Sequence, residues 1–92
     1  MPIHSVSYDL RAPGRNYEEL YAFLKDSNDW CRPSESYWLV VRDESASRLR
    51  DKIQEVVDSN DVVLVITIST PTGWGSQAMS KELNAWFRKY LG

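Results

Sequence analysis

The sequence has few residues for redox or metal chemistry. Its 92 residues include one cysteine, Cys31, and one histidine, His4. A single cysteine excludes an internal disulfide, and these two residues are too few to form a structural zinc site. No histidine lies near Cys31 in the sequence, so we interpret Cys31 as a buried structural thiol rather than a nucleophile. His4 begins the first apolar segment, and we expect it at the surface or at a sheet edge.

The sequence also lacks a long apolar run and an excess of basic residues. Its longest predominantly apolar run, residues 62–68, is far too short to span a membrane. Residues 1–10 lack the basic and apolar regions of a signal peptide, so we expect a cytoplasmic protein without a membrane partner. The formal net charge of −2 argues against indiscriminate phosphate binding, which needs a basic excess on at least one face. Any nucleic-acid role must therefore use local basic clusters.

The residues that are present fit one small globular domain over residues 1–92. Apolar residues make up 42% of the chain and charged residues 26%, which is the balance of a folded protein rather than of a disordered one. Apolar alternation predicts strands over residues 3–10, 30–32, 37–41 and 62–68. Helical spacing predicts a helix from Asn16 to about Ser27, a second from Ser45 to near Asp58, and a last one capped by Ser76 or Ser80.

The predicted order is β-α-β-β-α-β with an added carboxy-terminal helix. This order is typical of the α+β class and of the ferredoxin-like antiparallel sheet, in which both main helices pack on one face. Residues 62–68 have the pattern of a strand covered on both faces, with Val63 and Val65 on one side and Leu64 and Ile66 on the other. The aromatic last helix, a second subunit, or both must cover the face opposite the main helices. We therefore expect a homodimer.

The first predicted strand ends in Ser7-Tyr8-Asp9-Leu10. This tetrapeptide, the element order and the length together resemble the small ferredoxin-like endonucleases of the CRISPR adaptation machinery, the spacer-acquisition subunit that partners the spacer-integrating enzyme. The virulence-associated protein D interferases, which are toxin-type endoribonucleases, have a similar start. The resemblance implies a homodimer in which two copies of Asp9 face each other and hold a divalent metal, Mg²⁺, for phosphodiester cleavage. The serine-rich first strand and the aromatic last helix depart from the family's pattern.

Asp9 is the candidate catalytic and metal-binding residue. Magnesium prefers hard carboxylate oxygens, and a single carboxylate is a weak site, so the chemistry requires the second copy. The alternative is a strand-end aspartate that accepts backbone hydrogen bonds in the next turn or pairs with Arg11 or Arg15. Arg11 and Arg15 are the candidate nucleic-acid-binding residues, because guanidinium groups on this Pro-Gly loop can hold phosphate oxygens. The alternative is that both are solvated surface side chains.

Two further groups have structural interpretations. A second basic group near the second helix is diluted by Asp43, Glu44 and Asp51, so i,i+3 and i,i+4 ion pairs are its expected role; its members are Arg42, Arg48, Arg50 and Lys52. Trp74 lies between two glycines and could stack on a base, but we interpret it as a lid on the core.

Three function classes remain open from the sequence. The first is a metal-dependent endonuclease or toxin-type endoribonuclease acting on RNA or DNA. The second is a non-catalytic nucleic-acid-binding dimer, and the third is a protein-interaction module. Hydrolase triads, P-loops and dinucleotide-binding motifs are absent from the sequence.

Overall fold

The chain alternates strands and helices in the predicted order. The computed structural model describes residues 1–12 and 16–92. Within them, the strands are β1 (Ile3–Asp9), β2 (Asp29–Ser34), β3 (Tyr37–Val41) and β4 (Val62–Ile68). The helices in the same described ranges are α1 (Glu18–Lys25), α2 (Ala46–Gln54) and α3 (Lys81–Leu91). The α+β prediction is confirmed, including the added carboxy-terminal helix.

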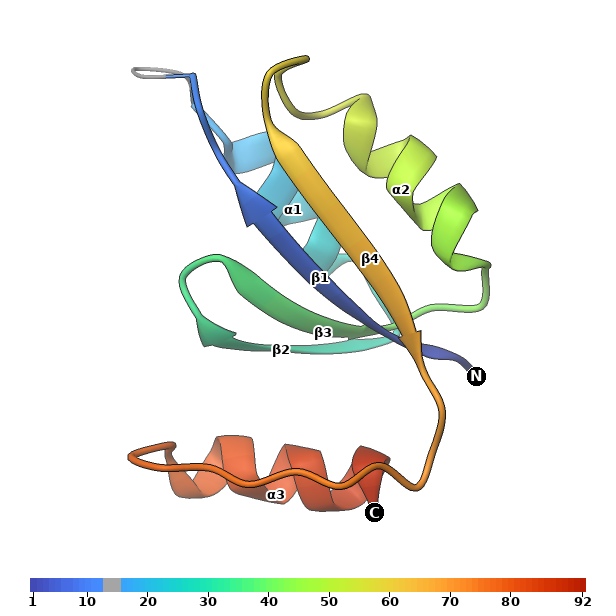
Figure 1. Cartoon of the computed structure of the whole chain (residues 1–92), viewed down its shortest axis with the longest axis vertical. Helices are drawn as coiled ribbons and strands as arrows, with labels where there is room; N and C mark the ends of the chain where they lie inside the picture. The colour runs from blue at the N-terminus through green and yellow to red at the C-terminus, as the bar shows by residue number, and fades with distance from the viewer. Residues whose placement is uncertain (13–15) are drawn as a thin grey trace.

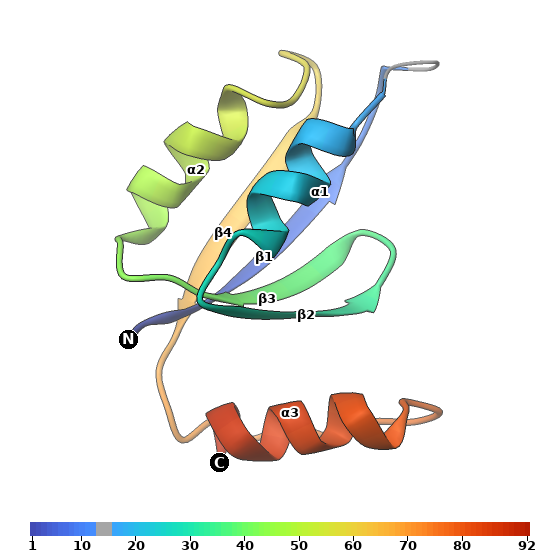
Figure 2. The ribbon, with the colours of Figure 1, turned by 180° about the vertical axis from the view of Figure 1, so that it is seen from behind.

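The described strands form one sheet in the order β2-β3-β1-β4, with every neighbouring pair antiparallel. This topology is compatible with the ferredoxin-like fold. Helices α1 and α2 lie on the same face of the sheet, which is turned toward the viewer in Figure 2. Helix α3 lies along the β2–β3 hairpin on the other side of the sheet (Figure 1). We call that second side the open face, because α3 covers only part of it.

The helix side of the sheet carries the larger core. Alternation in β1 and β3 turns Val6, Tyr8, Trp38 and Val40 toward α1 and α2, and all four are buried. The Trp38 Nε1–H donates to the Tyr8 hydroxyl at 2.9 Å, and that hydroxyl donates to the Glu35 carbonyl at 3.0 Å. The polar atoms of both rings are thereby satisfied inside the core, which removes a large desolvation cost.

Serine side chains determine where two of the helices begin. Ser45 Oγ accepts from the Arg48 N–H at the start of α2, and Ser80 Oγ accepts from the Leu83 N–H at the start of α3, both at 3.2 Å. Helix α1 begins at Glu18, two residues later than predicted, and Asn16 Oδ1 accepts from the Glu18 N–H at 2.9 Å just ahead of the helix.

Helix α3 covers one end of the open face. Its apolar stripe packs on a second core cluster formed by Ile3, Cys31, Leu39, Val41 and Leu91. Asp29 of β2 fastens the helix: its Oδ1 accepts from Trp86 Nε1–H at 3.1 Å, and its Oδ2 accepts from the Tyr90 hydroxyl. The Trp74 ring packs on Phe87 with centroids 5.1 Å apart, which confirms that Trp74 is a lid on the core.

One prediction about burial was wrong, and another is not met within a single chain. Residues 62–68 were expected to be covered on both faces by the last helix, a second subunit or both; in one chain β4 is an edge strand whose Leu64 and Ile66 side chains are 54% and 51% exposed. Helix α3 packs toward β2 and β3 and does not reach this row. His4 was expected at the surface or at a sheet edge, and it is fully buried in β1, between β3 and β4. Its Nε2–H donates to the Glu44 carbonyl at 2.8 Å, and its Nδ1 lies 3.0 Å from Thr67 Oγ1.

Among the helices of the described ranges, none combines the length and the apolar character needed to cross a lipid bilayer.

Candidate functional site

The end of β1 places Asp9 on the open face. Asp9 lies opposite Val62, the first residue of β4, and its side chain is 62% exposed. It shares this face with Ser5 and Ser7, because alternate residues of a strand point to the same side.

Arg11 is the partner of Asp9 in the described part of the site. Arg11 Nε lies 2.8 Å from Asp9 Oδ2, and the Arg11 side chain is 58% exposed. An exposed pair of this kind contributes at most about 1 kcal/mol to folding, so both groups keep the capacity to bind a ligand. The other predicted phosphate contact, Arg15, lies outside the described residues.

Asp61 anchors the turn that carries Arg11, and sequence reasoning missed it. One of its oxygens accepts from the Arg11 backbone N–H at 2.6 Å and from the Tyr17 hydroxyl at 3.0 Å. Its other oxygen accepts from the Asp58 backbone N–H at 2.8 Å. Asp61 thus holds the start of β4 against the chain that follows β1. The available signal was its place at the end of the polar run Asp58–Asp61, where aspartate often organises a turn.

Asp9 is the carboxylate that the sequence argument assigned to a metal. The described residues include no group of three or more His, Cys, Asp or Glu side chains arranged to bind a metal. Asp9 offers hard carboxylate oxygens, and the Arg11 guanidinium binds one of them.

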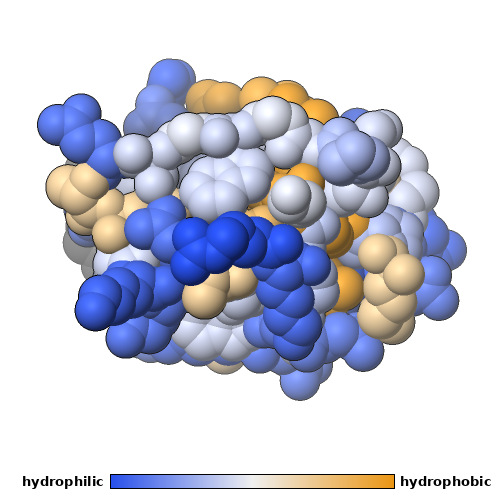
Figure 3. All heavy atoms as spheres, turned by 90° about the horizontal axis from the view of Figure 1, so that it is seen from below, coloured by the Kyte–Doolittle hydropathy of each residue, from blue (hydrophilic) through white to orange (hydrophobic). Residues whose placement is uncertain are grey.

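An apolar row lies beside Asp9 on the open face. Val62, Leu64 and Ile66 of β4 are 47%, 54% and 51% exposed. Their cross-strand partners on β1 are Asp9, Ser7 and Ser5. The side chains on the open face therefore change from apolar to polar between β4 and β1. Seen from below, most of the molecular surface is hydrophilic or intermediate, and hydrophobic atoms show at the upper rim and in gaps to the right of centre (Figure 3). We call Val62, Leu64 and Ile66 the β4 row.

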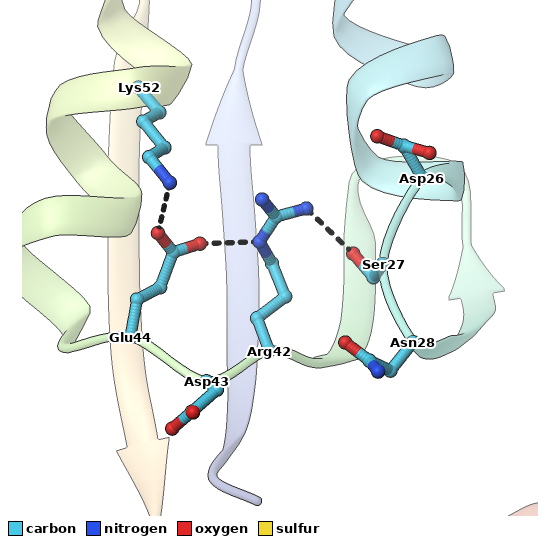
Figure 4. Close-up of a pocket in the computed structure, with 7 residues that line it drawn as sticks. All are labelled: Asp26, Ser27, Asn28, Arg42, Asp43, Glu44 and Lys52. Carbon is cyan, nitrogen blue, oxygen red and sulfur yellow. Dashed lines mark hydrogen bonds and ion pairs between the residues drawn. The ribbon is translucent and has the colours of Figure 1, made fainter.

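A polar pocket at the opposite end of the sheet has a structural explanation. Glu44 binds Arg42 through Oε2, and its Oε1 lies 2.6 Å from Lys52 Nζ (Figure 4). Arg42 also lies 3.2 Å from Ser27 Oγ and stacks on the Phe23 ring, so it joins α1 to the loop before α2. Burial opposes the charge on Glu44, but hydrogen bonds from Lys52 and Arg42 outweigh burial and lower the pKa of this carboxyl.

These contacts confirm ion pairing for three of the four members of the second basic group, which are Arg42, Arg50 and Lys52. Arg42 and Lys52 bind Glu44, and Arg50 binds Asp51 at 2.7 Å. The predicted i,i+3 and i,i+4 spacing was wrong, because the partners are one, two and eight residues apart. Glu44, which binds both Arg42 and Lys52, lies in the loop before α2 and not on the outer face of the helix.

Cys31 has the environment of a structural thiol. It is 5% exposed, and burial raises its pKa from 9.0 to about 12. A nucleophilic cysteine requires the opposite shift, because the thiolate is the reactive form. The structure therefore supports the interpretation of Cys31 as part of the core.

Comparisons of the chain with protein-family models, with curated proteins and with solved structures found no match.

Proposed function

We propose that this chain is a cytoplasmic homodimer that acts on nucleic acid as a magnesium-dependent endonuclease, with a cleavage site built from Asp9 of both copies. The observation that carries the proposal is the position of Asp9. Its exposed carboxylate borders the exposed β4 row on the same face of the sheet. The resemblance of the first strand to the CRISPR adaptation endonucleases and to the toxin-type interferases supports the same assignment.

The β4 row supplies a reason for two copies to associate. A two-fold contact buries the same patch of both molecules, and each row of half-exposed Val62, Leu64 and Ile66 side chains would lose its water. Asp9 is the cross-strand neighbour of Val62, so a contact centred on this end of the rows brings both carboxylates into one interface. The contact would offer a metal ion two carboxylates, one from each chain.

Asp9 and Arg11 would have different roles at this composite site: Asp9 would bind the metal ion, and Arg11 would bind the phosphate. The two Asp9 carboxylates would hold Mg²⁺, which supplies charge neutralisation at the phosphate and a more acidic bound water. Arg11 uses its Nε–H for Asp9, and the rest of its guanidinium is suited to phosphate oxygens because a guanidinium has five donors in a planar fork. Arg15 would extend the same phosphate contact on the loop that follows.

One observation favours a second candidate, a non-catalytic nucleic-acid-binding dimer. The Arg11 guanidinium occupies the Asp9 oxygen that a metal would need. If this pair persists in the dimer, Asp9 positions Arg11 for phosphate binding and holds no metal.

Cleavage of end-labelled RNA and DNA with and without Mg²⁺ separates the two candidates. The endonuclease requires that Asp9→Asn abolish cleavage while retaining binding, and that Asp26→Asn, an exposed carboxylate in another part of the molecule, leave cleavage unchanged. Magnesium-independent binding with no cleavage would favour the non-catalytic dimer. A wild-type protein that neither cleaves nor binds at low salt would exclude both candidates.

A further inference from the structure

We infer that the free edge of β4, together with the groove between β4 and α2, is a docking site for an extended segment of another protein, which adds to the sheet as a fifth strand. This inference goes beyond the proposed function and does not depend on it. The surface involved is the edge of β4 and its helix side, whereas the proposed dimer uses the open face.

The sequence of β4 has none of the features that normally protect an edge strand from pairing, and α2, which runs beside this strand, leaves hollows between the two elements. Within residues 1–12 and 16–92, the sheet order leaves one side of β4 without a neighbouring strand. The strand reads Val-Val-Leu-Val-Ile-Thr-Ile, with no charged residue, proline or glycine. Natural edge strands are usually shortened, charged or interrupted by proline or a bulge, because an open backbone ladder invites another strand. β4 is seven residues long, which is ample for a paired strand.

A groove runs beside this edge under α2. Helix α2 follows the outer side of β4 along its length (Figure 1). Two adjoining hollows of about 400 and 530 Å³ lie between the two elements and share Val63. Ala46, Ser47 and Arg50 line the first hollow from the α2 side. Val57 lines the second hollow together with polar residues, which are Gln54, Asp58, Ser59 and Asp61. Alternate side chains of an added strand would enter this groove, and the others would lie beside the β4 row.

The two ends of the groove carry opposite charges. Arg50 lines the hollow beside Val63–Val65, and Asp58 lines the hollow beside Val62 and Val63. Arg50 contacts Asp51, but this pair is half exposed, and the guanidinium has further donors for a second carboxylate. A strand with one acidic and one basic residue can therefore pair with both charges in only one of its two directions along the groove.

The charges define the partner segment. An antiparallel fifth strand continues the pattern of this sheet, in which every neighbouring pair is antiparallel. Opposite Val65 its groove-facing residue lies near Arg50 and should be acidic, and opposite Val63 it lies near Asp58 and should be basic. The segment is an alternating apolar strand with an acidic residue two positions before a basic one.

Fluorescein-labelled peptides test this site directly. Val-Thr-Val-Glu-Val-Lys-Val should bind the full chain about fivefold more tightly than its charge-reversed form Val-Thr-Val-Lys-Val-Glu-Val, as two exposed ion pairs allow. Arg50→Glu should abolish that preference, because each peptide then meets one like and one opposite charge, and Asp58→Asn should reduce it. Lys81→Glu, an exposed control on α3, should leave it unchanged. N-methylation of the peptide residues whose N–H groups face β4 should abolish binding, and N-methylation of the alternate residues should not.

Three results would overturn the inference. The first is no saturable binding of either peptide, and the second is equal binding of both. The third is self-association of the pure protein that Arg50→Glu disrupts, because a second copy would then fill the edge. Failure of the proposed dimer alone would appear differently, as a monomer that still binds the peptide.

Discussion

Asp9 and Val62 face each other across the β1–β4 ladder, so the candidate catalytic carboxylate and the exposed apolar row meet at one end of the open face. This relationship joins the two parts of the account. The apolar row gives a reason for two copies to associate, and the carboxylate gives their interface a chemical role.

Replacing the centre of the β4 row with a charge should separate the two copies. Leu64→Lys places an ammonium group in the proposed contact, where it would have to lose its water, while the side chain is 54% exposed in the single chain. We expect the wild type to sediment as a dimer at micromolar concentration and Leu64→Lys as a folded monomer with an unchanged circular dichroism spectrum. Ala85→Lys, on the exposed side of α3, should remain a dimer. A monomeric wild type would contradict the proposed interface.

Because the β4 row is half exposed, shortening one of its side chains to alanine should lower the free energy of unfolding less than the same change in the core. A large-to-small change costs about 2–5 kcal/mol only in a packed core. For Leu64→Ala we expect a loss of about 1 kcal/mol or less in urea unfolding at concentrations where the protein is a monomer. Leu49→Ala, at a fully buried position of α2, should cost about 2–5 kcal/mol in the same assay. Equal losses at the two positions would show that the row is already covered within one chain.

Asp29 should hold α3 on the open face. Asp29→Ala removes the acceptor for Trp86 Nε1–H and for the Tyr90 hydroxyl, and we expect the free energy of unfolding to fall by about 1–3 kcal/mol. The tryptophan emission should shift to longer wavelength as Trp86 becomes more exposed. Asp43→Ala, at an exposed position in the loop before α2, is the matched control. Unchanged stability and emission in Asp29→Ala would show that packing alone holds the helix.

Acid should weaken the fold through Glu44. Its carboxyl has an ordinary pKa of 4.5, and Lys52 and Arg42 lower that pKa in the folded state. A lowered folded-state pKa means that the stabilisation is complete above pH 4.5 and is lost as the pH falls through the lower folded value. Urea unfolding between pH 7 and 3 should show a steeper loss for the wild type than for Glu44→Gln. Parallel curves for the two proteins would exclude this contribution.

The sequence was sufficient for features that depend on neighbouring residues. Alternation placed Leu64 and Ile66 on the side of the strand opposite Val63 and Val65, and Ser45 marked the start of α2. Features that depend on distant partners were not predictable in this way. His4 is buried because residues 40 and 63 positions away supply its hydrogen bonds, and Asp61 reaches Arg11 across 50 positions. The exposure of β4 follows from where α3 packs, which the apolar pattern of β4 does not encode.

Subunit mixing tests the composite Asp9 site most directly. Wild-type protein and Asp9→Asn would be combined in known ratios at fixed total concentration, allowed to exchange, and assayed for magnesium-dependent cleavage. If both copies of Asp9 are required, activity follows the square of the wild-type fraction, because mixed dimers are inactive. Activity proportional to the wild-type fraction would show that each chain works alone, and cleavage by pure Asp9→Asn at the wild-type rate would show that Asp9 has no part in the reaction.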